Sequence, residues 1–292
     1  AANKSDTRKV VESAVSGTAQ WRKVIALERS RMLRRVAEVM RERTDEMARW
    51  LSLELGKPLD QSKGEVSMAI EQFEWYAEEA KRIYGHILES RQPHGKVLIQ
   101  HEPLGVVAAF TSWNFPVVLA ARKIAPALAA GCSVILRPAE EAPGSAMSLV
   151  QCLHEAGVPA GVINLINGSA DTISPVLLNE SRVRKISLTG SARVGKLLIK
   201  ASAETLKRTS MELGGHAPVI IYADADAEAI AEQAALVKFK HCGQVCASPS
   251  RYFIHESQAE AFTNKFIEIT QNFKLGNGME SGVDIGPLAT KK

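Results

Sequence analysis

The sequence has little of what marks several classes of protein. Its 292 residues contain only four cysteines, Cys132, Cys152, Cys242 and Cys246, too few for the disulfide framework of a secreted domain. We therefore expect a reducing, cytoplasmic setting. The formal net charge is only +4, and no cluster of basic residues is interleaved with aromatic residues. A nucleic-acid partner is therefore not expected.

Long hydrophobic runs are also absent. The most apolar region, residues 115–136, is interrupted by Arg122 and Lys123, whereas a membrane span needs about 20 consecutive apolar residues. We expect no membrane partner. The first eight residues are polar and do not resemble a signal peptide. The 46% hydrophobic and 23% charged residues are typical of a soluble globular protein, and the chain is long enough for two domains.

The N-terminal region is predicted to be helical. Apolar residues recur with a period near 3.6 over 29–50, as in an amphipathic helix. The run at 55–58 contains glycine and proline, which end helices, and a second helix is predicted over 63–83. Residues 87–101 are bounded by proline and glycine and are interpreted as an extended, hairpin-like arm.

From residue 104 the pattern changes to alternating strands and helices. Strands are predicted over 105–110, 133–136, 162–166 and 183–188, each followed by a helical stretch. This order predicts an α/β fold with a Rossmann-like parallel sheet that is covered by helices on both faces. Ligands bind such sheets outside the carboxyl ends of the strands. The residues that bind ligands should therefore lie in the turns that follow these strands.

We predict two domains. Residues 1–210 would form a dinucleotide-binding domain, with the N-terminal helices and the arm attached to it. Residues 211–292 would begin a second α/β unit, the catalytic domain, with a Gly-rich turn at 211–218 followed by a strand and a helix. Nothing in the last residues indicates that this unit closes, so we expect the catalytic domain to be incomplete.

The turn at 189–197 nearly matches a P-loop. The last position of that pattern is Leu197, so no hydroxyl is available to hold Mg²⁺, and the pattern G-x-G-x-x-G is absent. Gly190 and Ser191 remain at the N-terminus of a predicted helix, where N–H groups and the helix dipole suit a phosphate. The alternative is an ordinary Gly-Ser turn with Ser191 as N-cap.

Polar residues also follow the first two predicted strands. Glu140 follows the second strand, where a carboxylate can bond ribose hydroxyls and disfavour a 2′-phosphate; otherwise it is a carboxylate at a helix start. Asn114 follows the first strand as a neutral donor that can stabilise an oxyanion. Otherwise it caps the helix that begins near Pro116.

Cys246 is the candidate nucleophile. It follows a Gly-containing turn, from which a thiol can project into a cleft and act as a thiolate, although a lone cysteine is usually a buried apolar residue. Glu212, in the predicted Gly-rich turn, would be a general base or a solvated glutamate. His216, His241 and Cys242 match no zinc spacing, so no metal is expected. Pairing of Cys242 with Cys246 in a redox switch is a further alternative.

Together these stretches resemble the aldehyde dehydrogenase superfamily. The resemblance covers essentially the whole chain and rests on several motifs in family order. These are Leu53-Glu-Leu-Gly-Lys-Pro58, Ser112-Trp-Asn-Phe-Pro116, Leu188-Thr-Gly-Ser191, Glu212-Leu-Gly-Gly215, Gly243-Gln-Val-Cys246 and Gly286-Pro-Leu288.

The resemblance implies a role for each candidate. Cys246 would form a thiohemiacetal with an aldehyde, and Asn114 and the Cys246 backbone N–H would hold the oxyanion. After hydride has left to a nicotinamide ring, Glu212 would activate water to hydrolyse the thioester. The positions that contact the cofactor in the family are occupied by Ser112, Trp113, Arg137, Pro138, Ala139, Glu140, Gly190, Ser191 and Leu213.

Arg122 indicates the substrate under this resemblance. It lies two helical turns beyond Asn114, where succinate-semialdehyde dehydrogenases have an arginine that would clamp a distal carboxylate. The implied reaction is the NAD(P)-dependent oxidation of a semialdehyde such as succinate semialdehyde. The alternatives are an aldehyde dehydrogenase of other or broad substrate range, and a surface role for Arg122.

This sequence departs from the family pattern in three places. Arg137 stands where a lysine is usual, which leaves NAD and NADP both open, although Glu140 favours NAD. His241 stands where asparagine is common. The chain stops before the family's second glutamate and oligomerisation arm, so we expect a truncated chain. An inactive nucleotide-binding module is then an alternative, and the full-length protein is expected to be a homo-oligomer, a dimer or tetramer.

Overall fold

The computed structural model describes residues 1–291 and confirms the predicted α/β class. Residue 292, the last of the predicted catalytic domain, lies outside the described residues. The α-helices are α1 (Lys4–Trp21), α2 (Ala26–Glu42), α3 (Thr44–Leu55), α4 (Leu59–Ala80), α5 (Pro116–Ala129), α6 (Pro143–Glu155), α7 (Ala170–Asn179), α8 (Ala192–Ser202), α9 (Ala227–Phe239) and α10 (Glu256–Gln271). The strands are β1 (His86–Glu89), β2 (Lys96–Ile99), β3 (Val106–Phe110), β4 (Ser133–Arg137), β5 (Ile163–Leu165), β6 (Val183–Gly190), β7 (Arg208–Leu213), β8 (Val219–Ile221) and β9 (Tyr252–Ile254).

The central sheet has the order β5-β4-β3-β6-β7 and all its strand pairs are parallel. The chain starts in the middle at β3, adds β4 and β5 on one side, and then returns to add β6 and β7 on the other. This reversal creates the crevice at which Rossmann-like sheets bind ligands. The predicted parallel sheet is thus confirmed, and the switch point, where such folds have their ligand crevice, lies between β3 and β6.

Strand β7 corrects one sequence expectation. Residues 211–213 were expected in a Gly-rich turn, but they pair with β6, where Glu212 lies opposite Thr189. The turn begins only at Gly214. The predicted domain boundary after residue 210 falls inside this strand, and the division into two domains stays a prediction.

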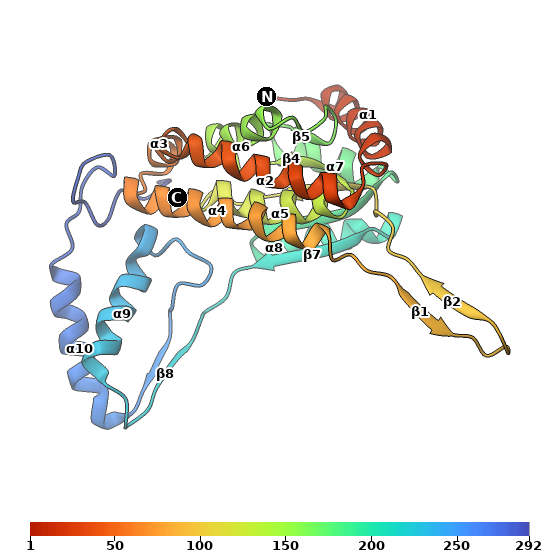
Figure 1. The fold of residues 1–292 in the computed structure, drawn as a ribbon. Helices are drawn as coiled ribbons and strands as arrows, with labels where there is room; N and C mark the ends of the chain where they lie inside the picture. The colour runs from red at the N-terminus through yellow and green to blue at the C-terminus, as the bar shows by residue number, and fades with distance from the viewer. Residues whose placement is uncertain (292) are drawn as a thin grey trace.

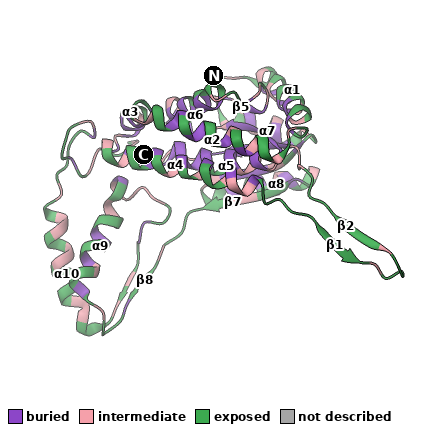
Figure 2. Ribbon diagram, in the orientation of Figure 1, coloured by how far each residue is buried: buried purple, intermediate pink, exposed green. Residues whose placement is uncertain are grey.

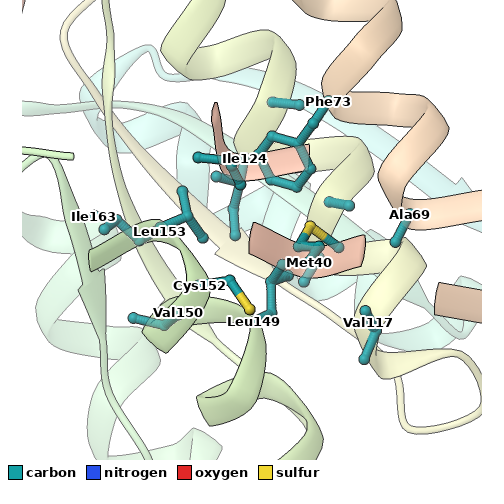
Figure 3. Packing of buried hydrophobic residues seen from close by; sticks show 14 of the residues in the cluster. Met40, Ala69, Phe73, Val117, Ile124, Leu149, Val150, Cys152, Leu153 and Ile163 are labelled. Atoms are coloured by element: carbon teal, nitrogen blue, oxygen red, sulfur yellow. The ribbon is translucent and has the colours of Figure 1, made fainter. Parts of the chain in front are cut away.

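Helices cover both faces of the sheet (Figure 1). Inward-facing residues alternate along β3: Val106 and Ala108 pack in a cluster with α1, α7 and α8, whereas Val107 and Ala109 pack in a larger cluster with α2 to α6. Figure 3 shows the larger cluster, in which Met40, Phe73 and Ile124 are fully buried. Burial of each such side chain is worth about 1.5–3 kcal/mol, so these two clusters hold the sheet rigidly under the site.

The predicted arm is a two-stranded hairpin. Strands β1 and β2 pair antiparallel from His86 opposite Ile99, and the hairpin projects away from the helices (Figure 1). Every residue of both strands is exposed (Figure 2). The exposed residues include apolar ones, with Ile87 71% and Leu98 63% exposed.

A second lobe follows β7. Strands β8 and β9 pair in parallel, and helices α9 and α10 pack beside them around a small cluster that includes Ile221, Ala231 and Phe262. None of the helices within residues 1–291 combines the length and the apolar character needed to cross a membrane.

After α10 the chain returns to the first helices. The N–H of Leu59 donates to the carbonyl of Gly278 at 2.9 Å, and Gln61 Nε2 donates to the carbonyl of Asp284 at 3.1 Å. At Gly286 the contact is so close that a Cβ atom would lie 1.8 Å from the carbonyl oxygen of Gly56. The segment 278–286 therefore packs closely against the turn between α3 and α4.

Candidate active site

The turns that carry the predicted site residues leave one edge of the central sheet. All its strands are parallel, so their carboxyl ends lie together. Residues 112–114 follow β3, residues 138–140 follow β4, and Ser191 follows β6. The structure thus brings the predicted oxyanion donor and most predicted cofactor residues to one side of the molecule.

The side chain of Asn114 is held at both ends. Its Oδ1 accepts a hydrogen bond from Ser112 Oγ at 2.8 Å, and its Nδ2 donates to the carbonyl of Gln244 at 2.9 Å. Because an amide has two N–H groups, one is left to donate to an oxyanion. The alternative that Asn114 caps α5 is wrong, since Phe115 is the N-cap and no side chain of its own turn caps the helix.

Cys246 lies in the loop that Asn114 contacts. Its side chain is exposed and unpaired with another cysteine, and it follows Gln244 by two positions. The bond from Asn114 therefore joins the turn after β3 to the segment that carries the thiol. No zinc-like cluster of histidine, cysteine and carboxylate residues occurs within residues 1–291.

The backbone before Cys246 is strained. His241 and Cys242 have φ values of 48° and 56°, in a left-handed region that costs about 1–2 kcal/mol for a residue with a Cβ. Such strain persists where the surroundings hold it. Here the N–H of His241 donates to Gln61 Oε1 at 2.9 Å, and Cys242 Sγ donates to the carbonyl of Gly286 at 3.0 Å. The sulfur of Cys242 is thus engaged with the returning segment.

A buried ion pair lies beside the turn that carries Asn114. The side chains of Lys57 and Glu65 are completely buried and in contact, and Lys57 Nζ also donates to the carbonyl of Asn114 at 3.0 Å. Glu65 Oε1 accepts the N–H groups of Val117 and Val118 at 2.9 and 3.3 Å. These N–H groups have no partner inside their own helix, so Glu65 of α4 caps α5.

Lys123, which follows Arg122 on α5, is buried. Its Nζ donates to Ser187 Oγ on β6 at 3.0 Å. Burial lowers the pKa of Lys123 to about 8, and the negative charge of Glu212 opposes that shift. Glu212 itself is exposed on the edge strand β7. No hydrogen bond within residues 1–291 joins it to Cys246 or Asn114.

The predicted cofactor residues follow strands on both sides of the switch point between β3 and β6. Ser191 is the N-cap of α8, and its Oγ accepts the N–H of Val194 at 3.3 Å; its contact with a cofactor phosphate stays a prediction. Arg137 contacts Glu140 and donates twice to the carbonyl of Gly168, at 3.2 and 2.8 Å. Its side chain is only 11% exposed, whereas that of Glu140 is 59% exposed.

Arg122 lies on α5 and is exposed. It enters none of the ion pairs among residues 1–291, so its guanidinium remains available to an anion. Lys57, Glu65 and Gln244 were not identified from the sequence as parts of the site. A lysine in a helix-ending turn and a glutamate on an amphipathic helix carry no signal that they will be buried together.

His241 is packed in an apolar wall of the site. Its ring is 1% exposed and meets the rings of Trp113 and Phe115 edge to face, with centroids 6.2 and 5.5 Å apart. Neither ring nitrogen has a hydrogen-bond partner within residues 1–291. Burial, followed by the nearby charge of Lys57, lowers the pKa of His241 to about 3. The ring is therefore neutral at physiological pH.

Replacing His241 by phenylalanine should stabilise the fold, because it removes two unpaired buried nitrogens that cost about 1–3 kcal/mol each. The advantage should grow on acidification. Between a folded pKa of about 3 and the ordinary value of 6.5, the unfolded chain binds the extra proton, so wild-type stability falls as pH falls. Between pH 7 and pH 5, the difference in free energy of unfolding between His241→Phe and wild type should therefore grow by about 2 kcal/mol. Urea unfolding at pH 7 and pH 5 checks this.

The matched control for that measurement is His216→Phe. His216 is exposed, so its replacement should give no comparable change between the two pH values. If wild type and His241→Phe differ by the same free energy of unfolding at pH 7 and at pH 5, the His241 ring is not buried in its neutral form.

Comparisons with known proteins agree on one family. A sequence profile described as the aldehyde dehydrogenase family matches residues 1–292. The glutarate-semialdehyde dehydrogenase of Pseudomonas putida is 42% identical over 288 residues, which are 99% of this chain and 60% of that protein. The 3-sulfolactaldehyde dehydrogenase of Pseudomonas putida is 43% identical over 284 residues, which are 97% of this chain and 58% of that protein.

A solved structure shows the same fold. The succinate-semialdehyde dehydrogenase from Burkholderia pseudomallei matches with a TM-score of 0.97 at 40% sequence identity, over 99% of this chain and 60% of that one. The chain thus spans about 60% of the length of the relatives it matches.

Proposed function

Because this chain belongs to the aldehyde dehydrogenase family, we propose that the whole protein oxidises an aldehyde bearing an acid group to the corresponding acid, with NAD or NADP. The observation that carries this proposal is the 2.9 Å bond from Asn114 Nδ2 to Gln244. It sets an amide donor beside the loop of an exposed, unpaired thiol, Cys246. That pair is what covalent catalysis on a carbonyl requires.

The proposed chemistry begins with the thiolate of Cys246. Its sulfur attacks the aldehyde carbon, and the oxyanion of the thiohemiacetal accepts hydrogen bonds from the free N–H of Asn114 and the backbone N–H of Cys246. When bound, a nicotinamide dinucleotide supplies the hydride acceptor that converts the thiohemiacetal into a thioester. Glu212 then takes a proton from water, which attacks the thioester and releases the acid and the thiolate.

The residues at the crevice fit a dinucleotide. In the eleven-residue helix α8, Ser191 already accepts the N–H of Val194; the N–H groups of Ala192 and Arg193 have no intrahelical partner and suit a pyrophosphate. After β4, Oε1 of Glu140 contacts Arg137 and accepts the N–H of Ala170 at 3.4 Å, and no hydrogen bond within residues 1–291 uses its Oε2. A ribose hydroxyl can donate to that oxygen, whereas a 2′-phosphate would be repelled. Arg137 already serves Gly168 and Glu140, so we propose NAD as the preferred cofactor and NADP as the poorer one.

The substrate proposal rests on Arg122 and on the relatives. The relatives' names specify aldehydes that carry a carboxylate or a sulfonate, and an exposed guanidinium without an ion pair is suited to hold such a group. Succinate semialdehyde and glutarate semialdehyde are the substrates we propose first.

Replacing Arg122 by alanine should raise KM for succinate semialdehyde about 10- to 100-fold, the equivalent of one hydrogen bond to a charged group. The KM for butanal, which lacks the carboxylate, should change little. Steady-state rates of NADH formation by the full-length protein measure both. The control is Arg35→Ala on the surface of α2. An equal change in KM for the two aldehydes would remove Arg122 from the substrate site.

The direct test of the function is aldehyde-dependent reduction of NAD and of NADP by the full-length protein. Succinate and glutarate semialdehydes are compared with neutral aldehydes of the same length. Turnover of neutral aldehydes alone would indicate another substrate range. Binding of NAD in calorimetry without turnover of any aldehyde would instead support an inactive nucleotide-binding module.

We further propose that the full-length protein is a cytoplasmic homo-oligomer. The support is the β1–β2 hairpin, whose apolar residues Ile87 and Leu98 are exposed, because exposed apolar patches mark interaction sites. Light scattering on the full-length protein determines the number of subunits.

A further inference from the structure

We infer that the buried ion pair of Lys57 and Glu65 positions Asn114 for the reaction and acts on the rate through that amide. The inference rests on the proposed function, since it takes Asn114 as the donor to the oxyanion. No hydrogen bond within residues 1–291 joins either residue to the loop of Cys246, so both are positioning residues.

The pair fixes the backbone at Asn114 and just after it. Lys57 Nζ donates to the carbonyl of Asn114 at 3.0 Å. Three and four residues further on, Glu65 Oε1 accepts the N–H of Val117 at 2.9 Å and that of Val118 at 3.3 Å. Since Lys57 and Glu65 also bind each other, the turn after β3 and the first turn of α5 are tied to one rigid unit.

The same stretch of chain holds the cysteine loop. Gln61, between Lys57 and Glu65 in sequence, accepts the N–H of His241 at 2.9 Å. The Lys57 ammonium also lies 4.0 Å from the centre of the Phe115 ring, which packs against His241. The segment 57–65 therefore sets the spacing between Asn114 and the loop that its Nδ2 contacts.

The chemistry of the pair favours positioning over stability. A buried ion pair can often be replaced by apolar residues without loss of stability, because both charges are desolvated on folding. An ammonium is nevertheless well suited to this place, since its N–H groups donate to a carboxylate and to a carbonyl at once. An oxyanion donor must be held within about 0.5 Å of its productive position, and the Lys57–Glu65 pair supplies that restraint.

A double-mutant cycle tests whether the pair acts through Asn114. Glu65→Gln is compared in the wild-type and Asn114→Ala backgrounds of the full-length protein. In the wild-type background kcat/KM should fall about 10- to 100-fold, the scale expected for a misplaced catalytic group. In the Asn114→Ala background Glu65→Gln should cause no further fall, because the amide through which it acts is gone.

Two reactions are followed so that the test does not depend on the aldehyde. The first is aldehyde oxidation, and the second is hydrolysis of 4-nitrophenyl acetate. In the second, the Cys246 thiolate attacks the ester carbonyl, the nitrophenolate leaves, and water then hydrolyses the acetyl thioester. No hydride acceptor is needed, and the oxyanion is formed at the same place.

Glu54→Gln is the matched control. Glu54 caps α6 much as Glu65 caps α5, accepting the N–H groups of Gly144 and Ser145 at 2.7 and 2.8 Å. No hydrogen bond within residues 1–291 joins it to Asn114. Any effect of Glu54→Gln on the rate should therefore be the same factor in both backgrounds.

The outcomes separate this inference from the proposed function. Equal losses from Glu65→Gln in both backgrounds would make the pair merely structural and overturn the inference, with the function intact. Ester hydrolysis that shows the predicted cycle without oxidation of any aldehyde would overturn the function and support the inference. If Asn114→Ala changes neither reaction, both are overturned.

A second variant covers the case in which Glu65→Gln does not fold. Lys57→Met combined with Glu65→Leu removes both charges and replaces them with apolar side chains of similar volume. Urea unfolding and NAD binding check that this variant is folded. The double variant should be folded and have a lowered kcat/KM. In the Asn114→Ala background the same two substitutions should cause no further fall in kcat/KM. A folded double variant that is as fast as wild type would overturn the inference.

Discussion

Replacing Cys246 by alanine is expected to reduce aldehyde oxidation at least about 10⁴-fold, because the covalent route needs the sulfur and no other group replaces a lost nucleophile. The thiol is exposed and lies outside both clusters that pack on the sheet, so the unfolding midpoint in urea should move little. The loss is measured as steady-state NADH formation, and calorimetry verifies that NAD still binds.

Cys242→Ala is the control in the same loop. Cys242 is part-buried and donates to Gly286, so its replacement should lower the free energy of unfolding by about 1 kcal/mol and leave most of the rate. If Cys246→Ala retains more than about a tenth of the activity while Cys242→Ala abolishes it, the nucleophile has been assigned to the wrong cysteine.

Replacing Glu212 by glutamine is expected to reduce steady-state turnover about 10²- to 10⁴-fold, the contribution of a general base. Hydride transfer, which precedes the hydrolysis, should proceed at its normal rate. Rapid mixing should therefore show an initial burst of about one NADH per subunit, followed by slow turnover as the thioester on Cys246 waits for water. Stopped-flow absorbance at the NADH band measures both phases.

Glu204→Gln provides the comparison for an exposed glutamate outside the crevice and should behave as wild type. A Glu212→Gln variant that loses the burst together with the slow phase would show that Glu212 acts before the thioester is formed. Because the charge of Glu212 raises the pKa of Lys123, the same variant should also lower the pKa of this buried lysine.

The positions of β3, β4, β5 and β6 could be predicted because each is a short apolar run that ends in a turn and is followed by a helical period. β7 could not be located in this way. Its first residues, Arg208, Thr209 and Ser210, have no apolar pattern, and they form a strand because the edge of β6 offers unpaired N–H and carbonyl groups. Tertiary pairing here outweighs local sequence preference.

The candidate site was less predictable than the sheet. From the residues alone, Asn114 remained either a donor or a helix cap, and the structure excludes the cap because Glu65 satisfies that end of α5. The burial of Lys57, Glu65 and Lys123 depends on which helices meet, which no local pattern encodes. Cys246 was singled out by its turn, but the contact of its loop with Asn114 follows only from the fold.

The packing of residues 278–286 against the turn after α3 affects the order in which contacts form while the chain is being synthesised. The central sheet closes with β7 at Leu213, so its helices and strands can assemble while later residues are still inside the ribosome. The contact of Cys242 with Gly286 must wait until that glycine has emerged. A nascent chain can therefore carry a folded central sheet before the loop of Cys246 has its final surroundings, because that loop is held in part by Gly286.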